Sequence, residues 1–403
     1  MSTLKVNTVL SADTPTVNVT DGLNVTGVST VTTLNTTNIV NSTPLSHRNK
    51  VINGDMRIAQ RATTSNAVGY VTIDRFSTDY GGEQEAMAYS QADISSGSPY
   101  EAGFAKSFKV QNGNQTSGAG ASDYIKFNTK LEAQDIANSG WNYKSASSFI
   151  TLSYWVKSSV AQTFFVRVTA LDSPVYNFPF SYSVSANTWT KVTKAIPGNS
   201  NLVFNNDNGT GLDIEWTLFR GTNTTGSGAT LDTWAAYDSS QRQPDNTSTW
   251  YTTNDATWEI TGVQLEVGDT ATTFEHRSFG DELARCQRYF QVLSRNTSAG
   301  LNQHSRYPAL GNGTNSTLWY CYHKQTMRVR PSLVTSNITS TTVEIFNYST
   351  SSGATYGGSS MSEGDENHSQ ITVTTTGGVS SGNVACWRFK INGDCYWAVS
   401  AEL

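Results

Sequence analysis

The sequence of 403 residues is longer than a typical single domain, so two or three domains are expected. Only 37% of the residues are hydrophobic but 11% are aromatic, and this balance, with many Thr, Ser, Asn and Gly residues, predicts an all-β protein with many turns. A formal net charge of −5 and the lack of a basic run argue against a nucleic-acid partner. Neither a signal-peptide pattern nor an apolar run of about 18 residues occurs, so membrane insertion is not expected.

Residues 1–46 form a weakly charged segment of Thr, Asn, Ser and Val. Asp21 and Gly22 stand between the alternating pieces VNVT and LNVT, which is a hairpin or corner signal. One or two short strands cannot bury a core of their own, so this segment is either disordered or packed against other chains. Its β-branched residues favour packing, and we predict a β-rich N-terminal stalk or attachment segment that is intertwined between subunits.

Residues 47–277 carry a long series of strand candidates without a helical interruption. In the clearest of them, GLDIEWTLF, apolar and polar residues alternate strictly, which is typical of a half-buried strand. The residues predicted to face the core are Leu212, Ile214, Trp216 and Leu218. Many strands separated by turn-rich spacers predict a jelly-roll β-sandwich over this range.

A linker helix is predicted over residues 278–293. Ser278 can cap it, and Asp281 three residues later completes a capping-box-like pair. Arg285 lies toward the C-terminal end, where the helix dipole favours a cation. The continuous apolar face of this helix would consist of Phe279, Leu283, Cys286, Phe290 and Leu293.

Residues 294–403 read as a small β-rich domain. Asn392 and Gly393 stand between two alternating runs, which predicts a hairpin with Phe389 opposite Tyr396. The four cysteines of the chain are dispersed without CxxC spacing, so we expect free and mostly buried thiols.

The sequence contains few residue patterns that are typical of catalysis. No metal-binding histidine spacing, nucleophile elbow or phosphate-binding glycine loop is present, so no catalytic residue, metal or cofactor is predicted. Acidic pairs such as Glu83 and Glu85 are more simply solvated turn residues than a glycosidase pair. The loop at residues 205–211, NNDNGTG, offers oxygen ligands for calcium but lacks the downstream bidentate glutamate, so a calcium ion there stays open.

Aromatic residues in polar segments are the binding candidates, because a flat ring with few rotamers can stack on a sugar. The alternative is that these rings plug the ends of the sandwich. The candidate glycan-binding residues are Trp234, Tyr237, Trp250, Tyr251, Trp319 and Tyr322.

Two stretches of the sequence are distinctive. The first is NKVINGDMRIAQR at residues 49–61 with DRF at residues 74–76, and the second is GVQLEVGDTATTFEHRSFGDELARCQRYF at residues 262–290. Both resemble a family of structural proteins of tailed phages, especially marine phages and cyanophages, which are described as tail fibres or carbohydrate-binding-like structural proteins. The start MSTLKVNTVLS resembles that of many phage fibres, whereas Thr273 stands where the family often has proline.

The resemblance covers roughly residues 1–290 and implies a carbohydrate-binding-like jelly-roll module in a virion appendage that is commonly trimeric. It supplies no catalytic residues. The charged stretch at residues 262–290 then resembles a domain junction, where polar pairs fix orientation rather than add stability. The residues expected to hold the sandwich, the helix and neighbouring subunits in register are Glu266, Glu275, Arg277, Asp281 and Arg285.

The first interpretation is a non-enzymatic, homotrimeric tail fibre or adhesin of a virion. Residues 1–46 would attach it to phage tail or capsid proteins, and residues 294–403 would form a tip that contacts a host-surface glycan. One alternative is a head fibre or capsid decoration protein of the same architecture. Another is a polysaccharide-degrading tailspike, against which stand the missing solenoid repeat and the lack of a persuasive carboxylate pair.

Overall fold

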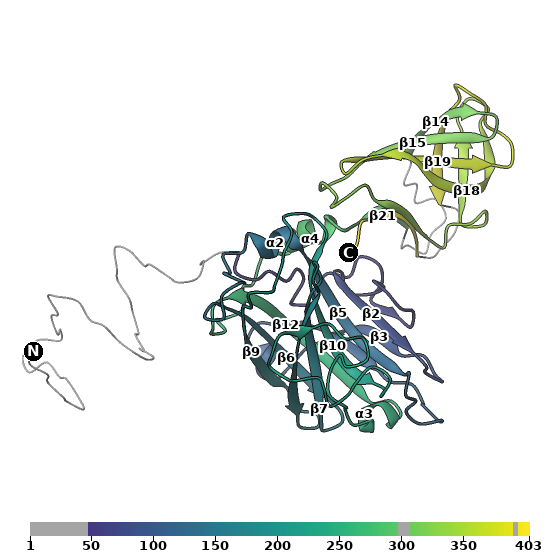
Figure 1. Ribbon diagram of the computed structural model, residues 1–403. Helices are drawn as coiled ribbons and strands as arrows, with labels where there is room; N and C mark the ends of the chain where they lie inside the picture. The colour runs from purple at the N-terminus through teal and green to yellow at the C-terminus, as the bar shows by residue number, and fades with distance from the viewer. Residues whose placement is uncertain (1–46, 297–306, 390–393) are drawn as a thin grey trace, which may run out of the picture. The chain divides into compact units, whose positions relative to one another are not determined.

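The computed structural model describes residues 47–296, 307–389 and 394–403 of the chain (Figure 1). The stalk predicted for residues 1–46 therefore lies outside the described residues. Strands dominate the described chain, which confirms the predicted all-β, jelly-roll-like class. Among the described residues, no helix is long and apolar enough to cross a membrane.

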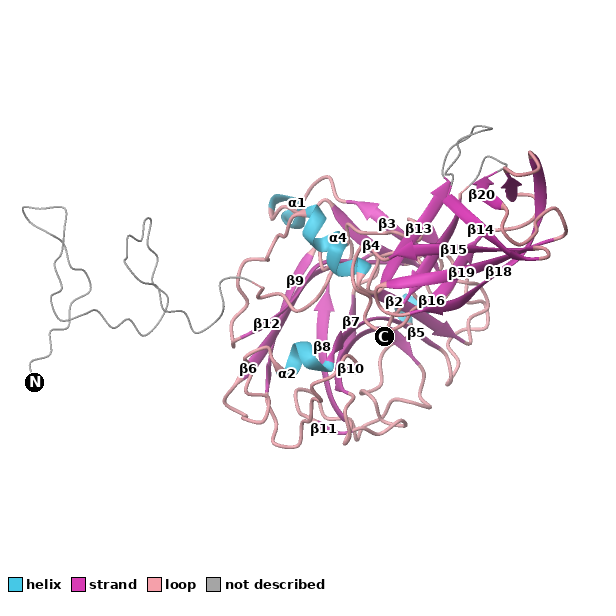
Figure 2. Cartoon of the chain, turned by 90° about the horizontal axis from the view of Figure 1, so that it is seen from above, coloured by secondary structure: helices cyan, strands magenta, loops and turns pink. Residues whose placement is uncertain are grey.

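Two six-stranded antiparallel sheets form the sandwich (Figure 2). Sheet A has the order β1-β3-β4-β12-β6-β9, with β1 at Thr64–Ser65, β3 at Ala88–Asp93, β4 at Lys106–Gln111, β12 at Thr257–Val267, β6 at Phe149–Ser158 and β9 at Thr190–Pro197. Sheet B has the order β11-β8-β7-β10-β5-β2, with β11 at Ala235–Ala236, β8 at Tyr176–Val184, β7 at Gln162–Ala170, β10 at Thr210–Arg220, β5 at Tyr124–Glu132 and β2 at Phe76–Gly81.

The core of the sandwich lies between these sheets and is strongly aromatic. The predicted inward face of β10 is confirmed, because Leu212, Ile214, Trp216 and Leu218 are all fully buried. Phe127 of β5 stacks on Phe108 of β4 with ring centroids 4.2 Å apart, so the two sheets meet through offset rings. Alternation along each strand therefore sends one set of side chains to this core and leaves the other set on the outer faces.

Three short helices sit in the connections of the sandwich: α1 at Ser98–Glu101, α2 at Ala133–Ala137 and α3 at Thr249–Thr252. The longer helix α4 runs from Phe279 to Gln287, so it ends well before the predicted residue 293. Phe290 and Leu293 belong instead to strand β13, Phe290–Asn296. Their apolar spacing resembles a helix, but pairing of β13 with β21 satisfies the backbone in an extended form.

The chain after α4 forms a three-stranded sheet and a closed barrel. The sheet has the order β13-β21-β16, with β21 at Cys395–Ser400 and β16 at Ser332–Ser336. The barrel has the order β14-β15-β19-β18-β17-β20, with β14 at Tyr307–Gly313, β15 at Ser316–Tyr322, β19 at His368–Thr375, β18 at Ser352–Gly364, β17 at Val343–Asn347 and β20 at Val384–Phe389.

The turn predicted at Asn392 and Gly393 lies outside the described residues, but the predicted pairing of Phe389 with Tyr396 is wrong. Strand β20 pairs with β14 and β17 in the barrel, whereas β21 pairs with β13 and β16 in the separate sheet. Side chains still connect the two units, because the rings of Trp387 and Trp397 have centroids 4.2 Å apart. All four cysteines are free and buried, as predicted.

Candidate functional site

Four of the six predicted glycan-binding aromatics are core residues. The exposed fraction of the side chain is 6% for Trp234, zero for Trp250 and Tyr251, and 3% for Trp319. Both indole N–H groups in the polar loops donate to backbone carbonyls, Trp234 to Pro197 and Trp250 to Thr257, at 2.7 and 3.1 Å. These rings plug the sandwich and the barrel and present no face to a ligand.

The other two predicted aromatics reach the surface. Tyr237 is 37% exposed, and the guanidinium groups of Arg167 and Arg242 lie 5.7 and 5.8 Å from its ring centroid. Tyr322 of β15 is 85% exposed, and its neighbour on the same face of that strand, Tyr320, is 56% exposed. Because strand side chains alternate, the buried Trp319 and Cys321 point inward while both tyrosines point outward.

Polar side chains of β19 flank the tyrosine pair. In the barrel register Tyr320 lies opposite Gln370 and Tyr322 lies opposite His368, whose ring centroid is 6.5 Å from that of Tyr322. His368 Nδ1 contacts Asp365 Oδ1 at 2.9 Å. The face therefore combines two exposed rings with an imidazole, groups that can bind the apolar side and the hydroxyls of a sugar.

An apolar row crosses the barrel next to this face. Leu310 of β14 pairs with Val384 of β20 on one side and with Leu318 of β15 on the other. Leu310 is 56% exposed and Val384 is 51% exposed. Contiguous exposed apolar side chains of this kind are typical of an interaction surface.

The two distinctive stretches of the sequence fold against one another. Asn49 donates its backbone N–H to Glu275 at 2.8 Å and its side-chain amide to the carbonyl of Val263 at 3.0 Å. Arg277 donates to the backbone carbonyls of Asn49 and Val51 and contacts both Glu275 and Glu282. The first stretch is thus tied to β12, to the loop after it and to helix α4.

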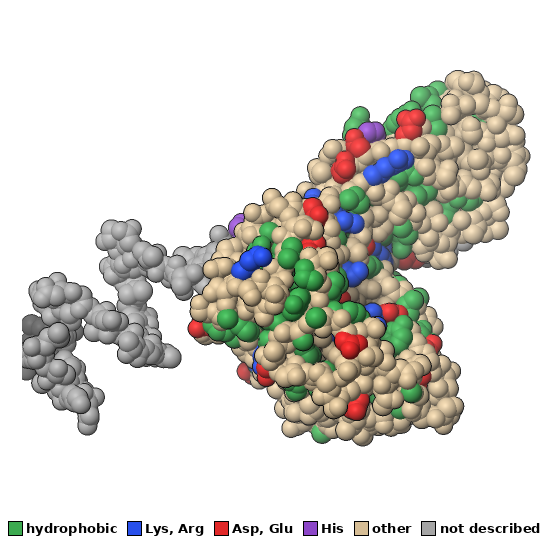
Figure 3. Space-filling view, viewed as in Figure 1, with side chains coloured by type: hydrophobic (Ala, Val, Ile, Leu, Met, Phe, Trp, Pro, Cys, Tyr) green, Lys and Arg blue, Asp and Glu red, His purple; other side chains and the backbone are tan. Residues whose placement is uncertain are grey.

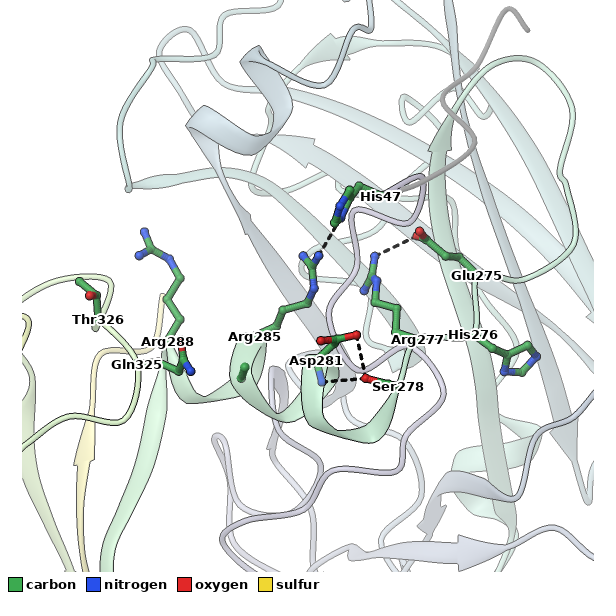
Figure 4. Close-up of a pocket in the computed structure, with 11 residues that line it drawn as sticks. His47, Glu275, His276, Arg277, Ser278, Asp281, Arg285, Arg288, Gln325 and Thr326 are labelled. Carbon is green, nitrogen blue, oxygen red and sulfur yellow. Dashed lines mark hydrogen bonds and ion pairs between the residues drawn. The ribbon is translucent and has the colours of Figure 1, made fainter. Parts of the chain in front are cut away.

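Most of the predicted junction residues surround one cavity of about 740 Å³ (Figure 4). Glu275 and Arg277 form an ion pair on one side, Asp281 accepts from Ser278 at the helix start, and Arg285 donates to His47 at 2.8 Å. Burial alone would raise the pKa of Glu275, but the backbone N–H of Asn49 and the charge of Arg277 outweigh it and lower the pKa.

Glu266 lies apart from that cavity. Its carboxylate accepts from the side chain of Gln264 and from both the N–H and the hydroxyl of Thr272, at 2.7 to 2.9 Å. The charge therefore fixes the loop after β12. Contacts of the five junction residues with neighbouring subunits stay a prediction.

Three residues between positions 61 and 75 hold the last residues of the chain, which the sequence did not indicate. The Glu402 carboxylate contacts Arg61 at 3.0 Å and also Arg75, and the carbonyl of Leu403 accepts from Tyr70 at 3.2 Å. The guanidinium of Arg75 lies 3.4 Å from the ring centroid of Tyr289, directly after α4. Glu402 lies more than 300 positions along the sequence from both Arg61 and Arg75, so no local sequence pattern predicts these contacts.

No group of three or more His, Cys, Asp or Glu side chains in the part of the chain that the structure describes is arranged to hold a metal ion. In the loop at residues 205–211, Asp207 Oδ1 accepts from the N–H of Gly209 at 2.9 Å. Asn205 bonds to Asp172 through both its backbone and its side chain. These polar groups are paired within the protein.

No family model and no curated protein matches the sequence. Among solved structures, the enzymatically active domain of tailspike protein 4 of bacteriophage CBA120 has a TM-score of 0.29 and 9% identity, covering 55% of this chain and 21% of the tailspike chain. A putative sugar binding protein from Bacteroides thetaiotaomicron has a TM-score of 0.29 and 10% identity over 55% of this chain and all of its own.

A family 11 carbohydrate-binding module from Clostridium thermocellum has a TM-score of 0.24 and 10% identity over 53% of this chain and 98% of its own. The chain thus spans about a fifth of the tailspike chain, whereas it covers the smaller chains almost completely. Resemblance at this level says nothing about ligand or activity.

Proposed function

We propose that this chain is a non-enzymatic structural protein of a tailed-phage virion, a homotrimeric tail fibre or adhesin that contributes to attachment to a host-surface glycan. The single observation that carries the glycan part is the pair of exposed rings, Tyr320 and Tyr322, on one face of β15. The virion part rests on the resemblance of residues 49–61 and 262–290 to phage structural proteins.

The tyrosine pair suits a sugar because alternate residues of one strand are about 6.8 Å apart and share a face. Two rings at that spacing give an apolar platform that loses little side-chain entropy on binding. His368 lies across the neighbouring strand, where it can reach the hydroxyls of a sugar stacked on the rings.

Weak binding at one platform becomes useful when several copies act together, because linked sites raise the effective ligand concentration. The apolar row of Leu310, Leu318 and Val384 supports such an assembly, since it offers a surface that a second copy of the barrel can cover. The ion pairs and hydrogen bonds of Glu402 and Glu275 hold distant segments of the fold together, and this supports a structural role for both residues. Residues 1–46 would attach the assembly to tail or capsid proteins.

The test is binding of the full-length protein to an array of purified bacterial surface polysaccharides. The double variant Tyr320→Ala/Tyr322→Ala should lose binding by about tenfold or more, because base or sugar stacking on an aromatic ring contributes about 1–3 kcal/mol per ring. Tyr100→Ala is the matched control, since Tyr100 is 53% exposed but lies on α1 of the sandwich.

Two outcomes would contradict the proposal. One is equal binding by the wild type and the tyrosine double variant to every polysaccharide that binds. The other is shortening of the bound polysaccharide during incubation, measured by size-exclusion chromatography, because a fibre that only binds leaves its ligand intact.

A further inference from the structure

The outer face of sheet A carries two tryptophans that the sequence did not mark as binding residues. Trp155 lies on β6 between Tyr154 and Val156, and both neighbours are fully buried in the core. Alternation therefore places the Trp155 ring on the outer face, where it is partly exposed. Trp189 directly precedes β9, the edge strand paired with β6, and is also partly exposed.

The two rings occupy a diagonal of this face. In the register of β6 and β9, Trp155 lies opposite Lys191, and Val156 lies opposite Thr190. The next position brings Trp189 beside Lys157, whose ammonium nitrogen is 4.8 Å from the ring centroid of Trp189. Diagonal neighbours on paired strands are about 7–8 Å apart, a spacing that a short sugar chain can bridge.

The indole N–H groups of this face are available to a ligand. Within the described parts of the chain, neither Trp155 nor Trp189 donates its indole N–H to another residue, and neither nitrogen is sealed from solvent. The buried tryptophans differ, since Trp234 and Trp250 both donate to carbonyls of the fold. Two partly exposed rings whose indole N–H groups have no partner among the described residues differ from the core tryptophans.

The charge around the rings is positive although the whole chain carries a formal charge of −5. Lys157 and Lys109 flank Glu259 in neighbouring strands, and Lys191 adjoins Trp155. Glu259 accepts from Lys157 at 2.8 Å and from Ser107 at 3.1 Å, so its carboxylate is already paired. Lys109 and Lys191 have no carboxylate partner in the described residues, which leaves cationic groups for an anionic ligand.

We infer that the outer face of sheet A, around Trp155, Trp189, Lys157 and Lys191, is a second binding site that takes an acidic polysaccharide. The tryptophans stack on the sugar rings, and Lys191 and Lys109 pair with the carboxylates of uronic-acid units. Lys157 stays paired with Glu259 beside the Trp189 ring. An acidic sugar chain matches both features, because it alternates apolar ring faces with isolated negative charges. The site is separate from the tyrosine pair on the barrel and does not depend on it.

Isothermal titration of the full-length protein with polygalacturonate, beside uncharged galactan, tests this inference. Polygalacturonate should bind more tightly than galactan and lose affinity as salt is raised, because exposed ion pairs are screened. Trp189→Ala and Lys191→Gln should each weaken binding, the tryptophan variant by about tenfold, whereas the double variant Tyr320→Ala/Tyr322→Ala should bind polygalacturonate as the wild type does.

Trp155→Ala is tested with Trp155→Phe beside it, since phenylalanine keeps a ring on the face and should retain part of the affinity. If Trp155→Ala fails to fold, Trp189→Ala and Lys191→Gln still decide, because both positions lie at the surface edge of the sheet. Three results would overturn the inference: unchanged polygalacturonate binding in these variants, tighter binding of oligo(dT) than of polygalacturonate, or a change in oligomeric mass, which would make this face a subunit contact.

Discussion

The side chain of Glu402 ties the last described residues to two arginines that are distant in the sequence, Arg61 and Arg75. Its carboxylate neutralises Arg75, which is 2% exposed, and Arg61, which lies 3.6 Å from the centroid of the Phe290 ring. Replacing Glu402 with Gln leaves a buried guanidinium without its counter-charge. We expect Glu402→Gln to lower the free energy of unfolding by about 3 kcal/mol or more, measured by urea denaturation.

Glu101→Gln serves as the matched control, because Glu101 is exposed and its substitution should change stability by less than about 0.5 kcal/mol. Equal stability of Glu402→Gln and Glu101→Gln would show that the C-terminal residues are not held as the structure has them.

Glu215 makes the stability of the sandwich depend on pH. It lies on β10 under Arg167 and Arg220, each of which donates to it at 2.7 Å. Burial alone would raise the pKa of Glu215, but the charges of Arg167, Arg220 and Lys126 outweigh it and hold the pKa well below 4.5. A lowered pKa contributes stability above the unfolded value near 4.5, and that contribution is lost as the pH falls below it.

We therefore expect wild type to lose stability as the pH falls from about 5 to 3, relative to Glu215→Gln, whose side chain does not titrate in this range. At pH 7 the wild type should be clearly the more stable of the two, and thermal unfolding at each pH measures the difference. A constant difference between pH 7 and pH 3 would contradict the assignment of the ionised form to Glu215.

Helix α4 is an element whose start the sequence predicts well. The Ser278 hydroxyl accepts from the N–H of Asp281 at 3.2 Å, which is the predicted N-cap bond, and it donates to the Asp281 carboxylate at 2.7 Å. Ser278→Ala should lower the free energy of unfolding by about 1 kcal/mol. Ser278→Asn should lower it much less, because asparagine can also cap a helix. Urea denaturation of both variants checks this, and equal losses would mean that the cap is not formed.

Local patterns fail where distant strands compete with them. The end of α4 and the β20–β21 hairpin were mispredicted, because β21 pairs with β13 and β16 from far along the chain. Spacing alone cannot detect such pairing. The inward face of β10 was predictable because strict alternation leaves one possible core side. Trp234 and Trp250 stand in polar segments, yet their N–H groups find carbonyls of the fold, which sequence does not show.

Under the proposed function, the barrel face carries both the surface for self-association and the tyrosine pair that binds a glycan. Much of the surface in Figure 3 is uncharged, with small scattered groups of acidic and basic side chains. Exposed apolar rows stand out against such a surface, and Leu310 lies at the centre of one. Leu310→Lys should leave monomer folding intact, because the side chain is 56% exposed, but should weaken self-association if a second copy covers the row.

Sedimentation equilibrium of Leu310→Lys beside Leu171→Lys measures this effect. Leu171 is 36% exposed and lies after β7 of the sandwich, so its substitution is the control for added charge. Identical association of the two variants would remove the apolar row from the assembly interface.

We propose trimeric assembly because weak glycan binding at one platform needs several linked copies to hold a virion on a cell. The most direct test is the mass of the full-length protein in solution, measured by light scattering over a wide range of concentration. We expect three times the mass of the chain, maintained on dilution. A single chain mass at every concentration would contradict it.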